Sequence, residues 1–203
     1  MIEHPKFFAE NGYVIIPELL TGELLDFIGI HAYNRARIEG VNPEDKQVPN
    51  TPSFYGDFVM ENLHDHLLPK MEQYTGLKLY PTYTYFRVYK AGDVLEKHKD
   101  RPSCEISVTL CLRKKQEEQI WPIFIENEDY KAKRNLKDSY TARAMLDEGD
   151  GLIYRGCECA HWRDKYKEGT KLAQVFLHYV DANGPNAEWK DDKKENKYFA
   201  QEK

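Results

Sequence analysis

Three side chains in this sequence have the types and spacing of a metal centre. His98 and Asp100 are separated by one residue at the end of a strand-like run over 80–98, and His161 follows about sixty residues later. Residues at i and i+2 of a strand point to the same face, so a histidine from a distant strand can complete a face of three ligands. Two histidines and one carboxylate on one side of a metal hold non-haem Fe(II) and leave positions open for other ligands. The sequence therefore predicts an iron site formed by these three residues.

Two further residues could hold an anion beside that metal. Lys171 lies ten residues after His161 at the start of a predicted strand, where its ammonium group could reach into the interior and pair with a dicarboxylate. A buried cation is costly unless it is paired, so an inward Lys171 requires an acid. Tyr89 lies on the same strand face as Arg87, and its hydroxyl could bond the same carboxylate. The alternatives are a solvated lysine at a strand start and ordinary aromatic packing.

The elements that must position these residues change in character along the chain. The first part predicts a short helix, a turn at Asn11-Gly12 and an apolar strand over 13–16, followed by a helix capped by Thr21. A long loop over 41–58 precedes a second helix over 63–74. Later segments alternate with the period of strands: 80–89, 105–112, 119–125, 142–146, 152–154 and 172–180. Helices followed by antiparallel-looking strands indicate an α+β domain, a β-sandwich or barrel buttressed by N-terminal helices.

Length and composition narrow the class of protein. With 203 residues, 41% hydrophobic and 31% charged, the chain is predicted to form one domain over 1–185, with a polar tail over 186–203. The net charge of −5 gives no basis for nucleic-acid binding. No apolar run approaches the roughly 20 residues of a membrane span, and the N-terminus has no signal-peptide pattern. Four unevenly placed cysteines favour reduced thiols in a cytoplasmic protein.

The joint order of several short motifs resembles a known superfamily. The Fe(II)/2-oxoglutarate-dependent dioxygenases share the following order: Tyr89-x-x-Gly92, His98-x-Asp100, a distant His161, and Gly169-x-Lys171. The prolyl 4-hydroxylase branch is the most similar, because it uses a lysine ten residues past the distal histidine. The resemblance covers about residues 80–180, and residues 8–17 are similar to the opening of phytanoyl-CoA dioxygenase-type members.

The resemblance implies a fold, a site and a reaction. It implies a double-stranded β-helix (jelly roll) in which His98, Asp100 and His161 hold Fe(II) and 2-oxoglutarate chelates the iron. The distal carboxylate of 2-oxoglutarate would pair with Lys171, helped by Tyr89 and Thr109. The reaction would consume O2, hydroxylate a small-molecule or peptidyl substrate, prolyl substrates included, and release succinate and CO2. Most members have arginine at the position of Lys171. The lysine therefore favours the prolyl 4-hydroxylase-like branch, but it does not identify the substrate.

Other interpretations remain open at this stage. A non-catalytic jelly-roll module would keep the fold and bind a ligand or a partner. A zinc or cupin-like enzyme could use Cys157-x-Cys159-x-His161, although buried reduced cysteines explain the same pattern. Arginines that flank the proposed ligands could recognise an acidic substrate or pair with surface acids: Arg101, Arg155 and Arg163. The segments 41–58 and 131–140 are candidate lids that would set substrate choice.

Overall fold

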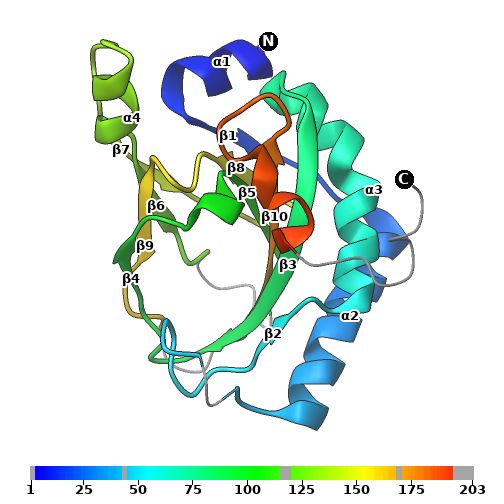
Figure 1. The fold of residues 1–203 in the computed structure, drawn as a ribbon. Helices are drawn as coiled ribbons and strands as arrows, with labels where there is room; N and C mark the ends of the chain where they lie inside the picture. The colour runs from blue at the N-terminus through cyan, green and yellow to red at the C-terminus, as the bar shows by residue number, and fades with distance from the viewer. Residues whose placement is uncertain (1–2, 43–44, 115–119, 168–170, 194–203) are drawn as a thin grey trace, which may run out of the picture.

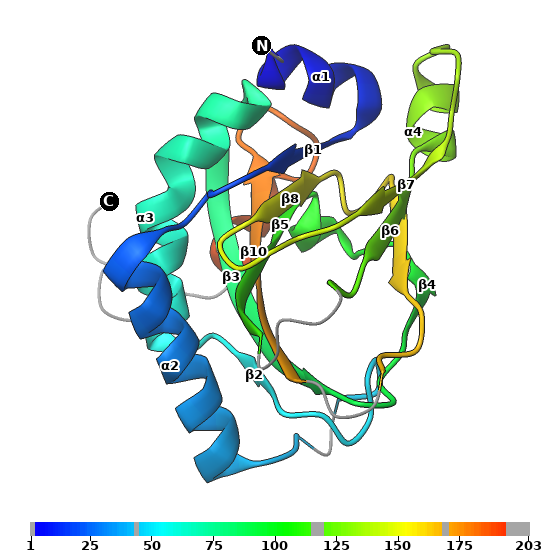
Figure 2. The ribbon, with the colours of Figure 1, turned by 180° about the vertical axis from the view of Figure 1, so that it is seen from behind.

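The strands form two antiparallel sheets that face each other (Figures 1 and 2). The computed structural model describes residues 3–42, 45–114, 120–167 and 171–193. The larger sheet has the strand order β1 (Tyr13–Ile16), β8 (Gly151–Tyr154), β5 (Ile106–Lys114), β10 (Lys171–Asp181), β3 (Leu79–Lys90) and β2 (Ser53–Tyr55). The smaller sheet has the order β4 (Leu95–His98), β9 (Ala160–Arg163), β6 (Ile123–Glu126) and β7 (Thr141–Ala144).

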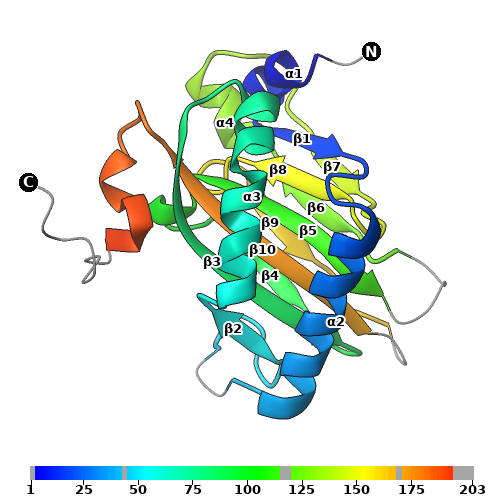
Figure 3. The same ribbon diagram turned by 90° about the vertical axis from the view of Figure 1, so that its right-hand side faces the viewer.

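The two long helices cover the outer face of the larger sheet, and Figure 3 shows them lying across it. The α-helices are α1 (His4–Asn11), α2 (Gly22–Glu39), α3 (Phe58–Thr75) and α4 (Glu128–Lys133), and the short 3-10 segments are η1 (Pro102–Cys104) and η2 (Ala187–Lys193). Asp57 caps α3 by accepting hydrogen bonds from the backbone N–H groups of Val59 and Met60. Gly76 ends α3 in the left-handed conformation at φ 73°, where its N–H donates to the carbonyl of Glu72.

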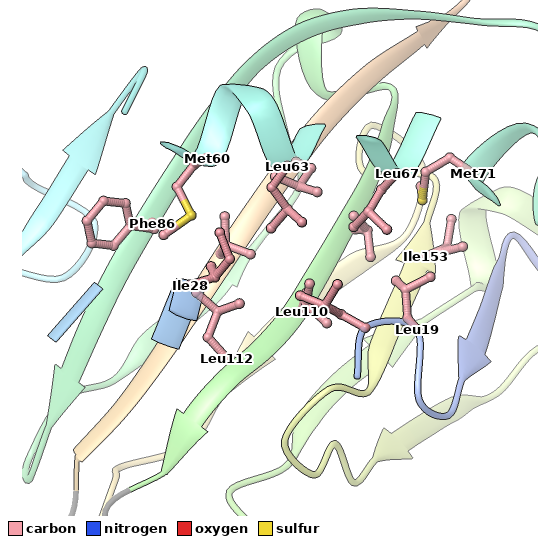
Figure 4. Close-up of a cluster of buried hydrophobic side chains, with 14 of the residues drawn as sticks. Leu19, Ile28, Met60, Leu63, Leu67, Met71, Phe86, Leu110, Leu112 and Ile153 are labelled. Atoms are coloured by element: carbon pink, nitrogen blue, oxygen red, sulfur yellow. The ribbon is translucent and has the colours of Figure 1, made fainter. Parts of the chain in front are cut away.

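The apolar core lies between α2, α3 and the larger sheet (Figure 4). From α3 it takes side chains spaced three or four residues apart: Met60, Leu63, Leu67 and Met71. Residues at this spacing share one face of a helix, so α3 presents an apolar stripe to the sheet. The sheet supplies alternate residues to the same cluster: Val108, Leu110, Leu112, Ile153, Val175 and Leu177. This apolar layer joins α2 and α3 to the outer side of the larger sheet.

A second core fills the space between the two sheets. The larger sheet contributes Tyr89, Cys111, Leu172 and Phe176, and the smaller sheet contributes Leu95, Ile123, Ile125 and Ala144. Because side chains alternate along a strand, β10 serves both cores, with Phe176 inward and Leu177 outward. The candidate metal ligands His98, Asp100 and His161 line a pocket on this inner side.

The structure agrees with the predicted α+β architecture of a jelly roll buttressed by N-terminal helices. The segment 41–58, predicted as a loop, contains the short strand β2 and the cap Asp57. Of the predicted tail over 186–203, η2 packs on β3, and 194–203 lie outside the described residues. Within the described ranges, every helix is too short or too polar to cross a bilayer.

Candidate metal centre

His98 and His161 lie side by side on neighbouring strands of the smaller sheet. His98 ends β4, and its Cα is paired in register with His161 of β9. The two ring centroids lie 4.3 Å apart. Asp100 follows β4, and its Oδ1 lies 3.6 Å from Nε2 of His98 and 3.5 Å from Nε2 of His161. The three side chains predicted from the sequence therefore present one oxygen and two nitrogens to a common point.

Backbone contacts orient both imidazole rings with Nε2 toward Asp100. Nδ1 of His98 lies 2.7 Å from the carbonyl oxygen of Glu96, and Nδ1 of His161 lies 3.0 Å from that of Cys159. A carbonyl oxygen only accepts, so these contacts assign a proton to Nδ1 and make Nε2 the nitrogen that can bind a metal. Such a contact fixes the tautomer and direction of a metal-binding histidine.

Asp100 lies against the turn that contains Gly156, near the start of β5. Its N–H donates to the carbonyl of Gly156 at 2.9 Å, and Ser107 Oγ lies 3.4 Å from Oδ2. A Cβ at position 156 would lie 2.3 Å from Asp100 Oδ2 and 2.4 Å from the carbonyl oxygen of Cys104. Glycine is therefore required at 156 for the carboxylate to occupy this position.

The charges of the three groups suit a cation. Burial would raise the pKa of Asp100, but the neighbouring charges of His161, His98 and His178 outweigh it and hold this pKa below the ordinary value. Burial lowers the pKa of His161, against the attraction of Asp100, which favours a neutral imidazole. Burial also opposes charge on His98, yet the hydrogen bond with Asp100 raises its pKa. A carboxylate with a neutral imidazole is the protonation state that binds a metal.

A pocket of about 300 Å³ opens at these three residues. Its wall is more polar than a usual apolar ligand site and includes Tyr83, Tyr85, Arg87, Arg101, Phe176 and His178. The guanidinium of Arg87 is already neutralised, because its Nη2 lies 2.6 Å from Oδ2 of the buried Asp45. The pocket is of the size that takes a small molecule or one side chain of a peptide.

The expectation that Lys171 reaches into the barrel is wrong, because Lys171 lies on the outer face of β10. Its Cα pairs with Lys90, its side chain is exposed, and it lines a surface pocket beside Tyr33 of α2. The next residue, Leu172, pairs with the inward Tyr89 and is buried between the sheets. The residue ten positions after His161 therefore faces outward, and the residue after it faces inward.

Besides the paired Arg87, a second buried cation inside the barrel is Arg163, two residues after His161 on β9. Its side chain is 1% exposed and has no acid within ion-pair distance among the described residues. Nη1 donates to the carbonyl of Trp121 at 2.5 Å, Nη2 donates to Gln174 Oε1 at 3.2 Å, and Nε is buried without a partner. Burial lowers its pKa, but a guanidinium stays charged at neutral pH. An unpaired buried charge is costly, so this position favours a bound anion.

Tyr89 and Thr109, the two residues that the resemblance placed beside the co-substrate, are buried between the sheets near Arg163. Tyr89 is fully buried, accepts a hydrogen bond from Arg87 at 3.2 Å, and packs edge-on against Trp121, which also stacks with Arg163. Thr109 Oγ1 accepts a hydrogen bond from Gln174 Nε2 at 2.6 Å. Both hydroxyl groups therefore belong to the polar surroundings of Arg163.

The cysteines do not form the soft-metal site that their spacing allowed. Cys159 is buried with Sγ 3.6 Å from the carbonyl oxygen of Gly12, and Cys157 Sγ contacts the carbonyl of Arg101. Across the described part of the chain, the second group with metal-binding geometry is Asp100, Cys104 and His178. Burial raises the pKa of Cys104 to about 12, so its thiol is protonated and a poor ligand.

Sequence reasoning missed residues that support the predicted ligands. Gly156, Ser107 and His178 surround Asp100, and Gln47 lies 2.8 Å from Nε2 of His98. Arg163 was considered only as a contact at the pocket mouth, although its i+2 spacing from His161 places both on one face. That spacing was the available signal for the buried cation.

Comparison with known proteins shows a fold match without sequence similarity. No protein-family model and no curated protein sequence matches the chain. A prolyl-4-hydroxylase from Pseudomonas putida has a TM-score of 0.63 at 15% identity, over 86% of this chain and 96% of that one. The non-heme alpha ketoglutarate dependent epimerase SnoN from nogalamycin biosynthesis has a TM-score of 0.70 at 14% identity, over 88% and 81%. HygX from Streptomyces hygroscopicus, solved with nickel and 2-oxoglutarate, has a TM-score of 0.62 at 16% identity, over 90% and 88%.

These likenesses establish the fold class. The chain has the jelly-roll fold of the Fe(II)/2-oxoglutarate-dependent oxygenases, the prolyl-4-hydroxylase among them. The resemblance in sequence motifs and the likeness in structure thus agree at the level of the fold.

Proposed function

We propose that this protein is an Fe(II)- and 2-oxoglutarate-dependent dioxygenase that hydroxylates a small-molecule or peptidyl substrate and releases succinate and CO2. The supporting observation is the convergence of His98, Asp100 and His161 beside a buried arginine that has no acid partner. Two imidazoles and a carboxylate on one side of a metal suit Fe(II) and leave positions for a chelating co-substrate and O2. When bound, the iron and 2-oxoglutarate supply the oxidation of an unreactive C–H bond.

The residues of this chain would place and shield that chemistry. His98, Asp100 and His161 would hold the iron, and the turn at Gly156 would fix the carboxylate. Arg163 would pair with the distal carboxylate of 2-oxoglutarate, in the role that the sequence assigned to Lys171. Such pairing would neutralise the buried guanidinium and occupy its unpartnered Nε. Tyr89 and Thr109 would contribute hydroxyl groups to the same site.

A small substrate and a reducing compartment fit these features. The pocket of about 300 Å³ is at the small end of ligand sites, which favours a small molecule or a single peptide side chain, including a prolyl ring. All four cysteines are free thiols, which supports the proposed cytoplasmic location.

An anaerobic titration tests the proposal. Fe(II) is added to the folded protein with 2-oxoglutarate, and the weak visible charge-transfer band of the chelate is recorded. We expect the band in the wild type and its loss in His98→Ala, while His66→Ala, an exposed histidine on α3, behaves like the wild type. Release of succinate on admission of O2 is the second readout. A folded wild type without the band would instead favour a non-catalytic binding module.

A further inference from the structure

The segment that follows the last strand returns to the pocket mouth. η2 packs against β3 and η1, and Figure 3 shows it as the red turn beside the green η1 segment. Lys190 Nζ lies 5.0 Å from the ring centroid of Tyr80, which anchors the turn on β3. This arrangement brings Asp192 to Arg101, the residue directly after the proposed ligand Asp100.

Arg101, Tyr55 and Tyr83 form a cradle around one carboxylate. Arg101 lines the same pocket as the proposed metal ligands, and its guanidinium lies 4.6 Å above the ring of Tyr83. Its Nη2 donates to Asp192 Oδ2 at 3.0 Å, and the Tyr55 hydroxyl donates to the same oxygen at 2.5 Å. Tyr55 stacks on Tyr83 with ring centroids 4.8 Å apart. The cradle therefore has one cation, one hydroxyl donor and an aromatic floor.

Asp192 fills the cradle, but its second carboxylate oxygen and its backbone are both in unfavourable states. The second carboxylate oxygen of Asp192, Oδ1, is buried without a hydrogen-bond partner. Asp191, Asp192 and Lys193 have φ angles of 53°, 51° and 57°, a left-handed run that residues with a Cβ rarely adopt. Burial would raise the pKa of Asp192, but its bonds with Tyr55 and Arg101 hold it below the ordinary value. The chain thus keeps a charged carboxylate at Arg101 at the expense of backbone strain.

The other cations of the pocket wall lack this feature. Arg87 pairs with Asp45, and both of these side chains are almost fully buried in the wall. Lys99 is paired with Asp129 on α4. The Arg101 side chain is 46% exposed, and its acid partner lies on η2, outside the wall, where the Tyr55 hydroxyl donates to the same carboxylate oxygen. Arg101 is therefore the wall cation beside which a second donor is already in place for an incoming anion.

We propose that the Arg101–Tyr55–Tyr83 cradle is the anion subsite for the substrate, and that Asp192 occupies it as an internal competitor in the free protein. The substrate would be a small carboxylic acid, because the cradle now holds a carboxylate and offers one positive charge. Its carboxylate would displace Asp192, release η2, and place the rest of the molecule beside His98, Asp100 and His161. The location of the reacting atoms rests on the proposed function, whereas binding at the cradle does not.

A binding assay without iron or 2-oxoglutarate tests the subsite. The probe is phenylacetate, the neutral control is phenylacetamide, and affinity is measured by calorimetry. We expect Asp192→Asn to bind phenylacetate at least tenfold more tightly than the wild type, and Arg101→Gln to show no binding. Asp191→Asn, an exposed neighbour, is the matched control and should equal the wild type. Phenylacetamide should bind none of the proteins, since it carries no charge.

Two further arms separate the possible outcomes. In the wild type, phenylacetate should accelerate tryptic cleavage after Lys190, because displacement of Asp192 frees η2. Arg163→Met should leave phenylacetate affinity unchanged, which distinguishes this subsite from the buried arginine. An Asp192→Asn protein with a lower melting temperature and no gain in affinity would show a structural clamp and overturn the proposal. The charge-transfer titration is scored separately, so failure here leaves the proposed function standing.

Discussion

The two faces of the larger sheet differ in chemistry although the same strands form both. On β10 the outward residues Ala173, Val175 and Leu177 pack beneath α2 and α3 in an apolar layer. The inward residues Gln174 and His178 are just as buried but are polar, and their neighbours include Arg163. Burial of apolar groups stabilises a fold, whereas burial of charges destabilises it unless partners are present.

The outer face of this sheet therefore serves the stability of the fold, whereas the inner face carries the candidate functional site. The outward residues Ala173, Val175 and Leu177 pack among apolar side chains of the protein itself and require no bound group. The inner face has an unpartnered Arg163 Nε and three ligand atoms gathered at one point. We infer that the inner face is completed by bound groups, and variants on the two faces should therefore behave differently.

The largest effect is expected at the proposed metal ligands. His98→Ala should lower 2-oxoglutarate-dependent succinate formation at least a thousandfold, about 4 kcal/mol of activation free energy, because one of three ligands is lost. The His98 side chain is 24% exposed, so the melting temperature should change little. Full succinate formation by the folded variant would show that His98 is not a ligand.

The outer face should respond in stability. Leu177→Ala leaves a cavity beneath the helices and should lower the free energy of unfolding by about 3 kcal/mol. The volume-conserving Leu177→Met should cost less than about 1.5 kcal/mol. Urea unfolding measures both. The folded fraction should need the same 2-oxoglutarate concentration as the wild type. A higher concentration would show that the outer face also affects co-substrate binding.

Arg163→Met should have opposite effects on binding and on stability. Loss of the charged hydrogen bonds should weaken 2-oxoglutarate binding by roughly 10- to 100-fold, about 2 kcal/mol. The ligand-free protein should be as stable as the wild type or more stable, since an unpaired buried charge is removed. Lys171→Met is the matched control, with less than a twofold change in 2-oxoglutarate affinity. Weaker 2-oxoglutarate binding in Lys171→Met, with unchanged binding in Arg163→Met, would show that Lys171 pairs with the co-substrate.

A smaller, pH-dependent effect is expected at Asp57 under α2 and α3. Burial would raise its pKa, but bonds from Met60 N–H, Arg35 and His31 hold it below the ordinary 3.8. Its charge therefore stabilises the fold fully above about pH 4, and this contribution is lost as the pH falls through the folded-state pKa. Asp57→Asn keeps a helix cap and should cost about 1 kcal/mol at pH 7.

Unfolding at two pH values measures this charge. The difference between wild type and Asp57→Asn should be smaller near pH 2 than at pH 7, whereas Asp57→Ala, which also loses the cap, should remain less stable at both values. An equal deficit of Asp57→Asn at pH 7 and pH 2 would contradict the assigned charge effect.

The sequence by itself determined the fold class and the three proposed ligands. Period-two alternation in β5 and β10 is a local signal, because it depends on neighbouring residues. The motif His98-x-Asp100 was also visible in the sequence, although Asp100 lies beyond the strand that ends at His98 and is placed by its N–H bond to the carbonyl of Gly156.

The tertiary structure decided which cation faces those ligands and what lies at the pocket mouth. Lys171 and Leu172 differ by one position, and strand pairing with Lys90 and Tyr89 turned the lysine outward. A one-residue change in phase reverses the face of a strand residue, and spacing along the chain does not fix that phase. The meeting of Asp192 with Arg101 joins residues 91 positions apart. Such long-range contacts arise from packing between elements, which local patterns do not encode.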